Sequence, residues 1–263
     1  YFNIATTKEI LKNKDEAVNY YNQAISIRPD FIEAYNELGN ILSELSRFDE
    51  SLSCYKKAIK INPKNEKTYN NLGNLLSDLG NHDEATKAYN QAIKIKPNYT
   101  KAYSNLLMNL NYKLDLNTKL YLDEAKKFGL NCKSIKKSLP IDYKYKKKPE
   151  KLKLGLVSSD FGNHPGGFFS LSTLRELNKK NFDLFGYPTL DRNDEFSHHF
   201  KPLFKKWSPI KKKKDEDVAK EIFDDGIHIL MDLQGHSADN RLPLFFYKAA
   251  PIQISWLSQG TLG

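Results

Sequence analysis

Long apolar runs and cysteines are both nearly absent from this sequence. No stretch of about 18 consecutive apolar residues occurs, so we expect no membrane-spanning helix. Cys54 and Cys132 are the only cysteines in 263 residues. Two separate thiols give neither a disulfide framework nor a metal-binding pattern, and they favour a reducing compartment, the cytoplasm. No cluster of His, Cys and carboxylate residues has metal-ligand spacing, so we expect no bound metal.

Arginine is also scarce. Only five of the 41 basic residues are arginines, so the formal net charge of +9 comes mostly from lysine. The densest lysine runs, at 144–153 and 211–214, fall where we expect a linker and a loop. Nucleic-acid sites favour arginine forks and clustered basic faces. We therefore interpret these lysines as solvated charge and expect no nucleic-acid partner.

Length and composition are those of an ordinary folded protein, with 40% apolar residues and room for two domains. The first residue is Tyr1 rather than Met, and Gly263 closely follows an apolar, strand-like segment. We therefore expect the sequence to be a piece of a longer protein.

The sequence does contain a repeat with a period of 34 residues. Proline, tyrosine, alanine and isoleucine recur at this step: Pro29, Pro63 and Pro97; Tyr21, Tyr55 and Tyr89; Tyr35, Tyr69 and Tyr103; Ala24, Ala58 and Ala92; Ile27, Ile61 and Ile95. This period predicts stacked helix-turn-helix units. We place them at about 1–31 (truncated), 32–65, 66–99 and 100–131 (degenerate), within a domain over residues 1–133.

The chemistry of each unit fits this interpretation. Gly39, which recurs as Gly73, would let the paired helix approach closely. Asp49 and Glu50 fall at the expected start of a second helix, where negative charge suits the helix dipole. Pro63 would end that helix.

Asparagines also recur inside the expected helices, although asparagine is a poor helix former. Asn40 and Asn74 share one repeat position, and Asn71 and Asn105 share another. An amide both donates and accepts hydrogen bonds, so a ladder of amides suits an extended peptide backbone. We interpret these four as peptide-binding residues on the concave face, and the recurring tyrosines and leucines as core.

The pattern changes after residue 150. Short apolar runs at 152–157, 182–187, 227–233 and 252–257 alternate with helix-like segments at 168–178, 217–223 and 240–248. Asp215 is a candidate cap for the second of these helices, and Gly226 separates it from the next strand. This alternation predicts an α/β lobe with a parallel sheet over residues 151–263, joined to the repeats by a lysine-rich linker at 134–150.

Candidate site residues lie where the expected strands end. The loops at 158–167, 234–241 and 258–261 are rich in glycine and small polar residues, and ligands bind beyond the carboxyl ends of parallel strands. The first loop has neither the GxGxxG spacing nor a Walker lysine, which disfavours a dinucleotide or triphosphate site.

Within the first loop, Asp160 precedes His164 by four residues. The carboxylate could orient the imidazole for general acid or base catalysis, and the alternative is that His164 only caps the next helix. Gly166 and Gly167 could bring backbone amides close to a phosphate. We interpret His228 as a core residue.

Three stretches carry a resemblance to a known family: LGLVSSDFGNHP (154–165), DGIHILMDLQGHSADNR (225–241) and APIQISWLSQGTLG (250–263). Placed after tetratricopeptide repeats, they resemble the amino-terminal catalytic lobe of protein O-linked N-acetylglucosamine transferases of the bacterial type. The resemblance implies two Rossmann-like lobes, a UDP-sugar donor as co-substrate without cofactor or obligatory metal, and serine or threonine acceptors delivered by the repeats.

The resemblance also implies roles for individual residues. His164 and Asp160 match the catalytic edge. Residues near the sugar or the acceptor, implied as substrate-binding, are Gly162, Asn163, His236, Leu257 and Ser258. The sequence departs from the family at Gly166 and Gly167, at Ser258, and in having no histidine between His82 and His164.

These departures keep two alternatives open: a catalytically inert repeat scaffold, and a related transferase that uses another sugar or asparagine acceptors. We expect the 263 residues to be inactive alone, because the lobe that would bind UDP lies beyond them. The sequence does not indicate an oligomeric state.

Overall fold

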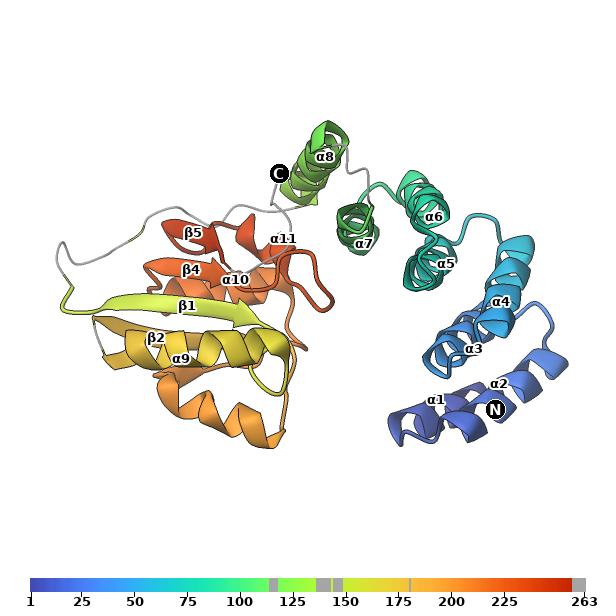
Figure 1. Ribbon diagram of the computed structural model, residues 1–263, viewed down its shortest axis with the longest axis horizontal. Helices are drawn as coiled ribbons and strands as arrows, with labels where there is room; N and C mark the ends of the chain where they lie inside the picture. Colours follow the sequence, from blue (N-terminus) through green and yellow to red (C-terminus); the bar gives the residue numbers. More distant parts are fainter. Residues whose placement is uncertain (114–117, 136–142, 144–148, 180, 257–263) are drawn as a thin grey trace. The chain divides into compact units, whose positions relative to one another are not determined.

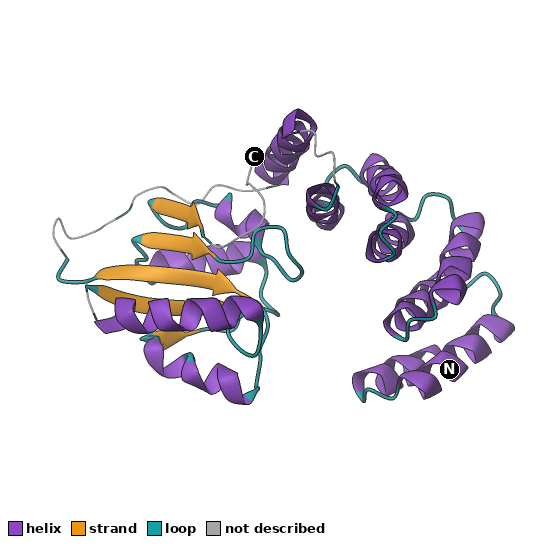
Figure 2. Ribbon diagram, in the orientation of Figure 1, coloured by secondary structure: helices purple, strands orange, loops and turns teal. Residues whose placement is uncertain are grey.

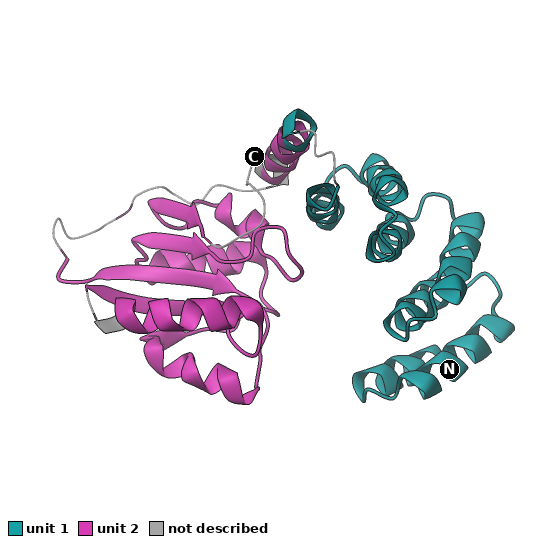
Figure 3. Cartoon of the chain, in the orientation of Figure 1, with its two compact units in different colours: residues 1–121 teal, residues 122–263 magenta. Residues whose placement is uncertain are grey.

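The structure is a computed structural model that describes residues 1–113, 118–135, 143, 149–179 and 181–256. The chain forms two compact units, Tyr1–Tyr121 and Leu122–Gly263, coloured separately in Figure 3. The described part of the first unit is built from helices, and the second unit contains a β-sheet (Figure 2). This confirms the predicted fold class, helical repeats followed by a parallel α/β lobe.

The repeats form consecutive helical hairpins (Figure 1). The helices are α1 (Phe2–Ile10), α2 (Lys14–Ile27), α3 (Ile32–Glu44), α4 (Phe48–Ile61), α5 (Glu66–Asp78), α6 (His82–Ile95), α7 (Thr100–Asn111) and α8 (Thr118–Ile135). Each predicted unit up to residue 99 holds one hairpin. Asp49 and Glu50 lie in the first turn of α4 as predicted, and Pro63 follows soon after its end.

Two glycines allow the helices of a hairpin to touch. A Cβ atom added at Gly39 would lie 2.6 Å from Cε1 of Tyr55, and one at Gly73 would lie 2.5 Å from Cε1 of Tyr89. Both tyrosine rings are buried. The predicted close approach at the repeated glycine is therefore confirmed, and the repeated tyrosine ring is the group that lies against it.

The turn inside each hairpin has the same backbone conformation in three units. Lys12, Ser46 and Gly80 are 34 residues apart, and all three have positive φ, at 61°, 59° and 76°. Only glycine adopts this left-handed conformation without steric cost. The fold therefore imposes the turn even where the sequence supplies lysine or serine.

The second unit contains a sheet of five parallel strands in the order β3-β2-β1-β4-β5. The strands are β1 (Leu152–Ser158), β2 (Phe182–Pro188), β3 (Lys206–Trp207), β4 (Ile229–Asp232) and β5 (Ile252–Ser255). The helices that follow β1 in the chain are α9 (Pro165–Lys179), α10 (Asp215–Asp224) and α11 (Leu242–Phe245), with 3-10 turns η1 (Glu195–His199) and η2 (Lys201–Leu203).

Alternating residues of β1 face two separate cores. Leu154 and Leu156 pack with Leu174 of α9, whereas Val157 packs with Val218 and other residues of α10 and α11. Helices therefore cover both faces of the sheet, which is the three-layer arrangement expected for parallel strands (Figure 2).

Several predicted boundaries differ from the structure. The third apolar run, 227–233, shortens to β4, and the expected helix at 240–248 shortens to α11. The turns η1 and η2 and the short strand β3 were not predicted, because residues 195–207 carry no helical or alternating pattern. Gly226 does separate α10 from β4, with φ of 65°.

The prediction that Asp215 caps α10 was wrong. Lys214 occupies the N-cap position, and Asp215 is the first helical residue. The Asp215 carboxylate instead accepts a hydrogen bond from Arg241 Nε at 2.6 Å. Arg241 also donates to the Ile210 and Lys213 carbonyls, so it fastens the start of α10 to the start of α11.

The division between the units, after Tyr121, differs from the predicted domain boundary after residue 133. Most of α8 belongs to the second unit, because the buried ring of Phe128 lies 4.9 Å from the His236 ring and 6.2 Å from the Phe246 ring. The predicted linker at 134–150 lies largely outside the described residues.

Candidate active site

The strand order defines where a site can form. From β1 the chain crosses to β2 on one side, and β4 pairs with β1 on the other side. The loops after β1 and β4 therefore meet at the carboxyl edge, at the point where the strand order reverses. They are in contact, because Gln234 Oε1 accepts a hydrogen bond from the Ser159 backbone N–H at 2.8 Å.

Asp160 and His164 lie together at this edge, as the sequence predicted. Nδ1 of His164 is 3.3 Å from Oδ2 of Asp160, and the two side chains are 41% and 14% exposed. The same Nδ1 is 3.2 Å from the Gly166 backbone N–H, which can donate to it. A ring nitrogen makes only one of these bonds at a time, because the first needs a proton on Nδ1 and the second needs a lone pair.

Both interpretations of His164 are therefore present in one geometry. With the proton on Nδ1, the ring donates to Asp160 and leaves Nε2 free to accept a proton, which is what a general base requires. With Nδ1 bare, the ring accepts from Gly166 and acts as a helix cap at the start of α9.

The two glycines after Pro165 serve packing. A Cβ atom at Gly166 would lie 2.6 Å from Oδ2 of Asp160. A Cβ atom at Gly167 would lie 2.3 Å from the Gly162 carbonyl oxygen and 2.5 Å from that of Asp160. Carbonyl oxygens lie where a side chain at Gly167 would be, so the close approach of the β1 loop to α9 explains the glycine at this position. The expected approach of backbone amides to a phosphate stays a prediction.

Asn163 and Gly162 lie beside a second carboxylate that the sequence did not single out. The Asn163 backbone N–H donates to Asp194 Oδ2 at 3.1 Å, and Asp194 Oδ1 accepts from the Ser197 N–H at 2.8 Å. Desolvation opposes ionisation of Asp194, but these two N–H donors outweigh it and hold its pKa below the usual range. A side chain at Gly162 would meet Asp194 Oδ2 at 2.7 Å.

A cavity of 310 Å³ opens beside this loop, lined by Asn163, Phe168, Asp194, Glu195, Phe196 and His199. The exposed Phe168 ring lies 4.5 Å from the Phe196 ring. Asn163 therefore borders a space with one aromatic wall and one acidic wall, next to the Asp160–His164 pair.

Asp232 is a further buried carboxylate at the carboxyl edge, only 1% exposed. It accepts from the backbone N–H groups of Gln234 and Gly235 and from the Ser255 hydroxyl, at 3.2, 2.8 and 3.0 Å. Burial raises the pKa of Asp232, and the nearby Asp160 charge adds to the rise. Its position at the end of an apolar strand was the signal that could have identified it.

His236 lies in the loop after β4. Its side chain is 2% exposed and packs edge-to-face against Phe128 of α8. The ring of Phe128 lies against this side chain, and the substrate-binding role expected for His236 stays a prediction. Leu257 and Ser258, and the rest of the loop after β5, lie outside the described residues.

Three other histidines lie in the lobe, and one of them, His199, lines the cavity beside Asn163. His228 precedes β4 and is half-buried, and its Nδ1 accepts from the Lys153 N–H at 2.9 Å. Burial and the Lys153 charge lower its pKa. His228 is thus a hydrogen-bonded residue of the sheet, in keeping with its expected structural role. His198 and His199 are exposed in η1.

The four repeat asparagines are half-buried and hydrogen-bonded to neighbours. Asn40 Oδ1 accepts from the Tyr55 hydroxyl at 2.7 Å, and Asn74 Oδ1 accepts from the Tyr89 hydroxyl at 3.0 Å. Asn105 Nδ2 donates to Asn74 Oδ1 at 2.9 Å, across adjacent repeats.

Asn71 has the longest of these contacts, because its Oδ1 accepts from Asn70 Nδ2 at 3.4 Å. Asn70 is fully buried and also accepts from Asn105 Nδ2 at 2.9 Å. The asparagines therefore have a structural reason to recur, and their remaining hydrogen-bonding capacity is what a peptide could use.

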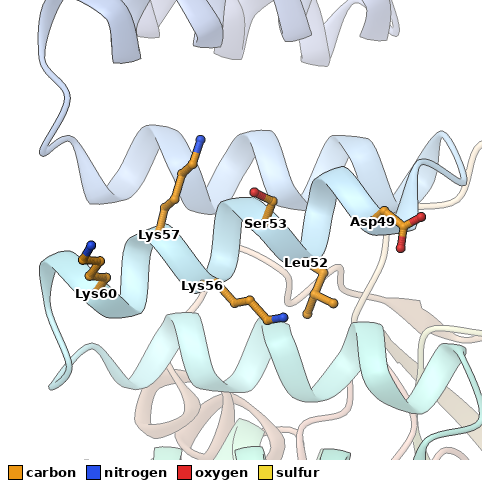
Figure 4. Close-up of a pocket in the computed structure, with 6 residues that line it drawn as sticks. All are labelled: Asp49, Leu52, Ser53, Lys56, Lys57 and Lys60. Carbon is orange, nitrogen blue, oxygen red and sulfur yellow. The ribbon is translucent and has the colours of Figure 1, made fainter.

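Two further cavities lie in the repeats. One of 550 Å³ is lined by Phe2, Thr6, Glu9, Ile10, Tyr21 and Glu37. The other, of 330 Å³, is lined along α4 by Asp49, Leu52, Ser53, Lys56, Lys57 and Lys60 (Figure 4). In the second, the four charged or polar side chains that follow Leu52 are exposed, as expected for a solvated helix face.

Among the described residues, no three His, Cys, Asp or Glu side chains are grouped as a metal ion would require. No described helix has the length and apolar character needed to cross a membrane.

Comparison with known proteins identifies the family. Residues 112–263 match the sequence profile of glycosyl transferase family 41, and residues 12–46 and 30–98 match tetratricopeptide repeat profiles. Because the family 41 match covers more than half of the chain, this protein belongs to glycosyl transferase family 41.

Two curated relatives carry names that describe an activity. A Caenorhabditis elegans protein named UDP-N-acetylglucosamine--peptide N-acetylglucosaminyltransferase is 34% identical over 117 residues, which are 41% of this chain and 10% of that protein. An Arabidopsis thaliana protein named "Probable UDP-N-acetylglucosamine--peptide N-acetylglucosaminyltransferase SEC" is 31% identical over 141 residues, 53% of this chain and 14% of that protein. The chain thus spans a minor part of the relatives' length.

A solved structure confirms the fold. The Thermobaculum terrenum O-GlcNAc transferase, as its K341M mutant, superposes with a TM-score of 0.81 over 96% of this chain and 49% of that chain, at 23% identity. The order of a helical repeat region and a parallel α/β lobe is therefore shared with that protein.

Proposed function

We propose that this protein is a protein glycosyltransferase that transfers N-acetylglucosamine from UDP-N-acetylglucosamine to serine or threonine side chains of protein acceptors. The observation that carries the proposal is the His164–Asp160 contact of 3.3 Å, at the carboxyl edge of a family 41 lobe. The relatives' names support the donor and the peptide acceptor.

In the proposed reaction, Asp160 holds the proton on Nδ1 of His164, and Nε2 takes the proton of the acceptor hydroxyl. The acceptor oxygen forms a bond to the anomeric carbon as the bond from that carbon to the UDP oxygen breaks, so UDP leaves with the electron pair. Nothing in this step needs a cofactor or an obligatory metal, because the UDP-sugar is a co-substrate. The tetratricopeptide repeats would hold the acceptor, with Asn40, Asn71, Asn74 and Asn105 contacting its backbone.

The activity is proposed for the protein at its full natural length, since these 263 residues match 49% of the bacterial O-GlcNAc transferase chain. The buried free thiols of Cys54 and Cys132 favour a reducing compartment, so we propose that the reaction takes place in the cytoplasm.

Substitution of His164 tests the proposal in the protein at its full natural length. We expect His164→Ala to lower kcat by about 10²- to 10⁴-fold, the usual contribution of a general base. The exposed His198 gives a matched control, and His198→Ala should retain activity. Unchanged transfer by His164→Ala would remove this residue from the mechanism, and mass spectrometry of modified peptides would identify the sugar and the acceptor atom.

A catalytically inert scaffold is the second candidate. It is favoured by His236, which Phe128 covers, and by the absence of histidine between His82 and His164. Titration calorimetry separates the two candidates: a scaffold would bind acceptor peptides through the repeats and show no heat of binding with UDP-N-acetylglucosamine.

A further inference from the structure

A buried amide lies behind the Asp160–His164 pair. Gln234 follows β4 and is 3% exposed. The register pairs Val157 of β1 with Asp232 of β4, so Ser159 and Gln234 each lie two residues beyond a paired position. The Asp232 carboxylate binds the turn at 234–235, where Gly235 has φ of 59°, and this turn returns the Gln234 side chain toward the β1 loop.

All four hydrogen-bonding positions of the Gln234 amide are in use. Oε1 accepts from the Ser159 N–H at 2.8 Å and from the Thr189 hydroxyl at 3.3 Å. Nε2 donates to the Ser159 Oγ at 2.6 Å and to the Ala238 carbonyl at 2.9 Å. The opposite amide orientation would place a donor against the Ser159 N–H and an acceptor against the Ala238 carbonyl. The orientation of the amide is therefore fixed.

A fixed amide gives the Ser159 hydroxyl a fixed direction. Its oxygen accepts from Gln234 Nε2, so its single proton is available for Asp160 Oδ1, which lies 2.7 Å away. With Oδ1 held by this bond, Oδ2 of Asp160 is the oxygen that faces Nδ1 of His164. The contacts run in one line from Gln234 through Ser159 and Asp160 to His164.

We propose that Gln234 and Ser159 are positioning residues that aim the Asp160 carboxylate at Nδ1 of His164. This assignment deepens the proposed function and rests on it only for the catalytic use of His164. The arrangement biases the imidazole toward the Nδ1–H form, because a carboxylate held in place competes with the Gly166 N–H for that nitrogen. Without the hydrogen bonds from Gln234 to Ser159 and from Ser159 to Asp160, the Asp160 carboxylate can rotate away from His164. Nδ1 of His164 then accepts from the Gly166 N–H instead.

The test is the tautomer of His164, read from its imidazole ¹⁵N resonances at a pH where the ring is neutral. Ser159→Ala removes the hydroxyl and leaves the backbone N–H that binds Gln234. Gln234→Glu keeps the shape of the side chain but turns the donor into an acceptor, which draws the Ser159 proton away from Asp160. We expect each variant to lower the ratio of the Nδ1–H to the Nε2–H form by about threefold or more, the size of one weak hydrogen bond.

Ser208 provides the control. It is also a buried serine of the second unit, and its hydroxyl also donates to a carboxylate, that of Glu221 at 2.7 Å. Ser208→Ala should leave the His164 resonances unchanged. If Gln234→Glu fails to fold, as judged by circular dichroism, Ser159→Ala alone carries the test. An unchanged tautomer ratio in a folded Ser159→Ala protein would overturn the proposal.

The result is distinguishable from failure of the proposed function. The resonances are measured without donor or acceptor, so they report the positioning alone. If Ser159→Ala shifts the ratio while His164→Ala leaves sugar transfer intact, the positioning assignment stands and the catalytic role of His164 falls.

Discussion

The two units use side-chain amides to join segments that lie at very different distances in the sequence. In the repeats, Asn74 accepts from the hydroxyl of Tyr89, 15 residues away, and from Asn105 of the next repeat. In the lobe, Gln234 bonds Ser159, which is 75 residues away. The repeat bonds join neighbours in a stack and recur with its period. The lobe bond joins two loops that become neighbours only through the strand order.

Glycines show the same contrast. Gly39 and Gly73 each accommodate a tyrosine ring of the following helix, whereas Gly167 accommodates backbone carbonyl oxygens of the preceding loop. A side-chain ring can shift by a few tenths of an ångström, but a backbone segment held by a parallel sheet cannot shift without moving its neighbours.

The largest effect is therefore expected for Gly167→Ala. The new Cβ atom would lie 2.3 Å from the Gly162 carbonyl oxygen, so the loop that carries Asp160 and His164 must move. We expect unfolding free energy to fall by about 3 kcal/mol, at the upper end for overpacking, with loss of the ordered His164 resonances. Chemical denaturation measures the first quantity. Ser172→Ala, a substitution at an exposed residue of α9, is the control. Equal stability of the two variants would contradict the packing argument.

Gly39→Ala should cost less, about 1–2 kcal/mol, because the clash is with the Tyr55 ring rather than with backbone. Its readout is thermal unfolding of the repeats followed by helical circular dichroism. The exposed Lys60 of α4 supplies a control, since Lys60→Ala should change stability by no more than about 0.5 kcal/mol. A larger loss for Gly39→Ala than for Gly167→Ala would reverse the comparison between the two units.

A pH effect is expected in the lobe at Glu221. Desolvation opposes its ionisation, but hydrogen bonds from Lys213, Ser208 and Lys206 outweigh it and lower the pKa of Glu221 to about 2. The folded pKa is below the unfolded value of about 4.3, so this stabilisation is present above pH 4.3 and is lost as the pH falls toward 2.

We expect Glu221→Gln to lower the unfolding free energy of the lobe at pH 7 by about 1 kcal/mol, after allowance for solvent screening, and to have little effect near pH 2. Urea denaturation at several pH values measures this difference. Glu216→Gln, in the exposed first turn of α10, should show a smaller dependence on pH. A pH-independent effect of Glu221→Gln would mean that the lysine contacts do not determine its ionisation.

The smallest expected effect is a gain in stability, at the turn residue Ser46. Ser46 has φ of 59° at the turn position where the next repeat has Gly80. Ser46→Gly should raise stability by about 0.5 kcal/mol, because relief of backbone strain exceeds the entropy that glycine adds to the unfolded chain. Gly80→Ala should lower stability by about 1 kcal/mol at the equivalent position. Thermal unfolding of both variants checks the sign, and the same sign for both would refute the shared turn.

Much of the fold followed from the sequence, and less of the candidate site did. The period of 34 located the hairpins and predicted close helix approach at Gly39, and the structure adds that the Tyr55 ring is what lies there. The Asp160–His164 pair could also be predicted, because four residues across one loop can only be near one another. The burial of His236 could not, since nothing in the loop after β4 indicates that Phe128 of α8 packs against it.

The sequence by itself determined the contacts between residues at short or periodic separations, because helical hairpins repeat the same local geometry. Only the tertiary structure decided that β4 pairs with β1, and hence that Gln234 lies against Ser159 and behind His164. An apolar strand can pair with any other apolar strand in a parallel sheet. The partner is chosen by how the crossovers and both cores pack, which no local pattern records.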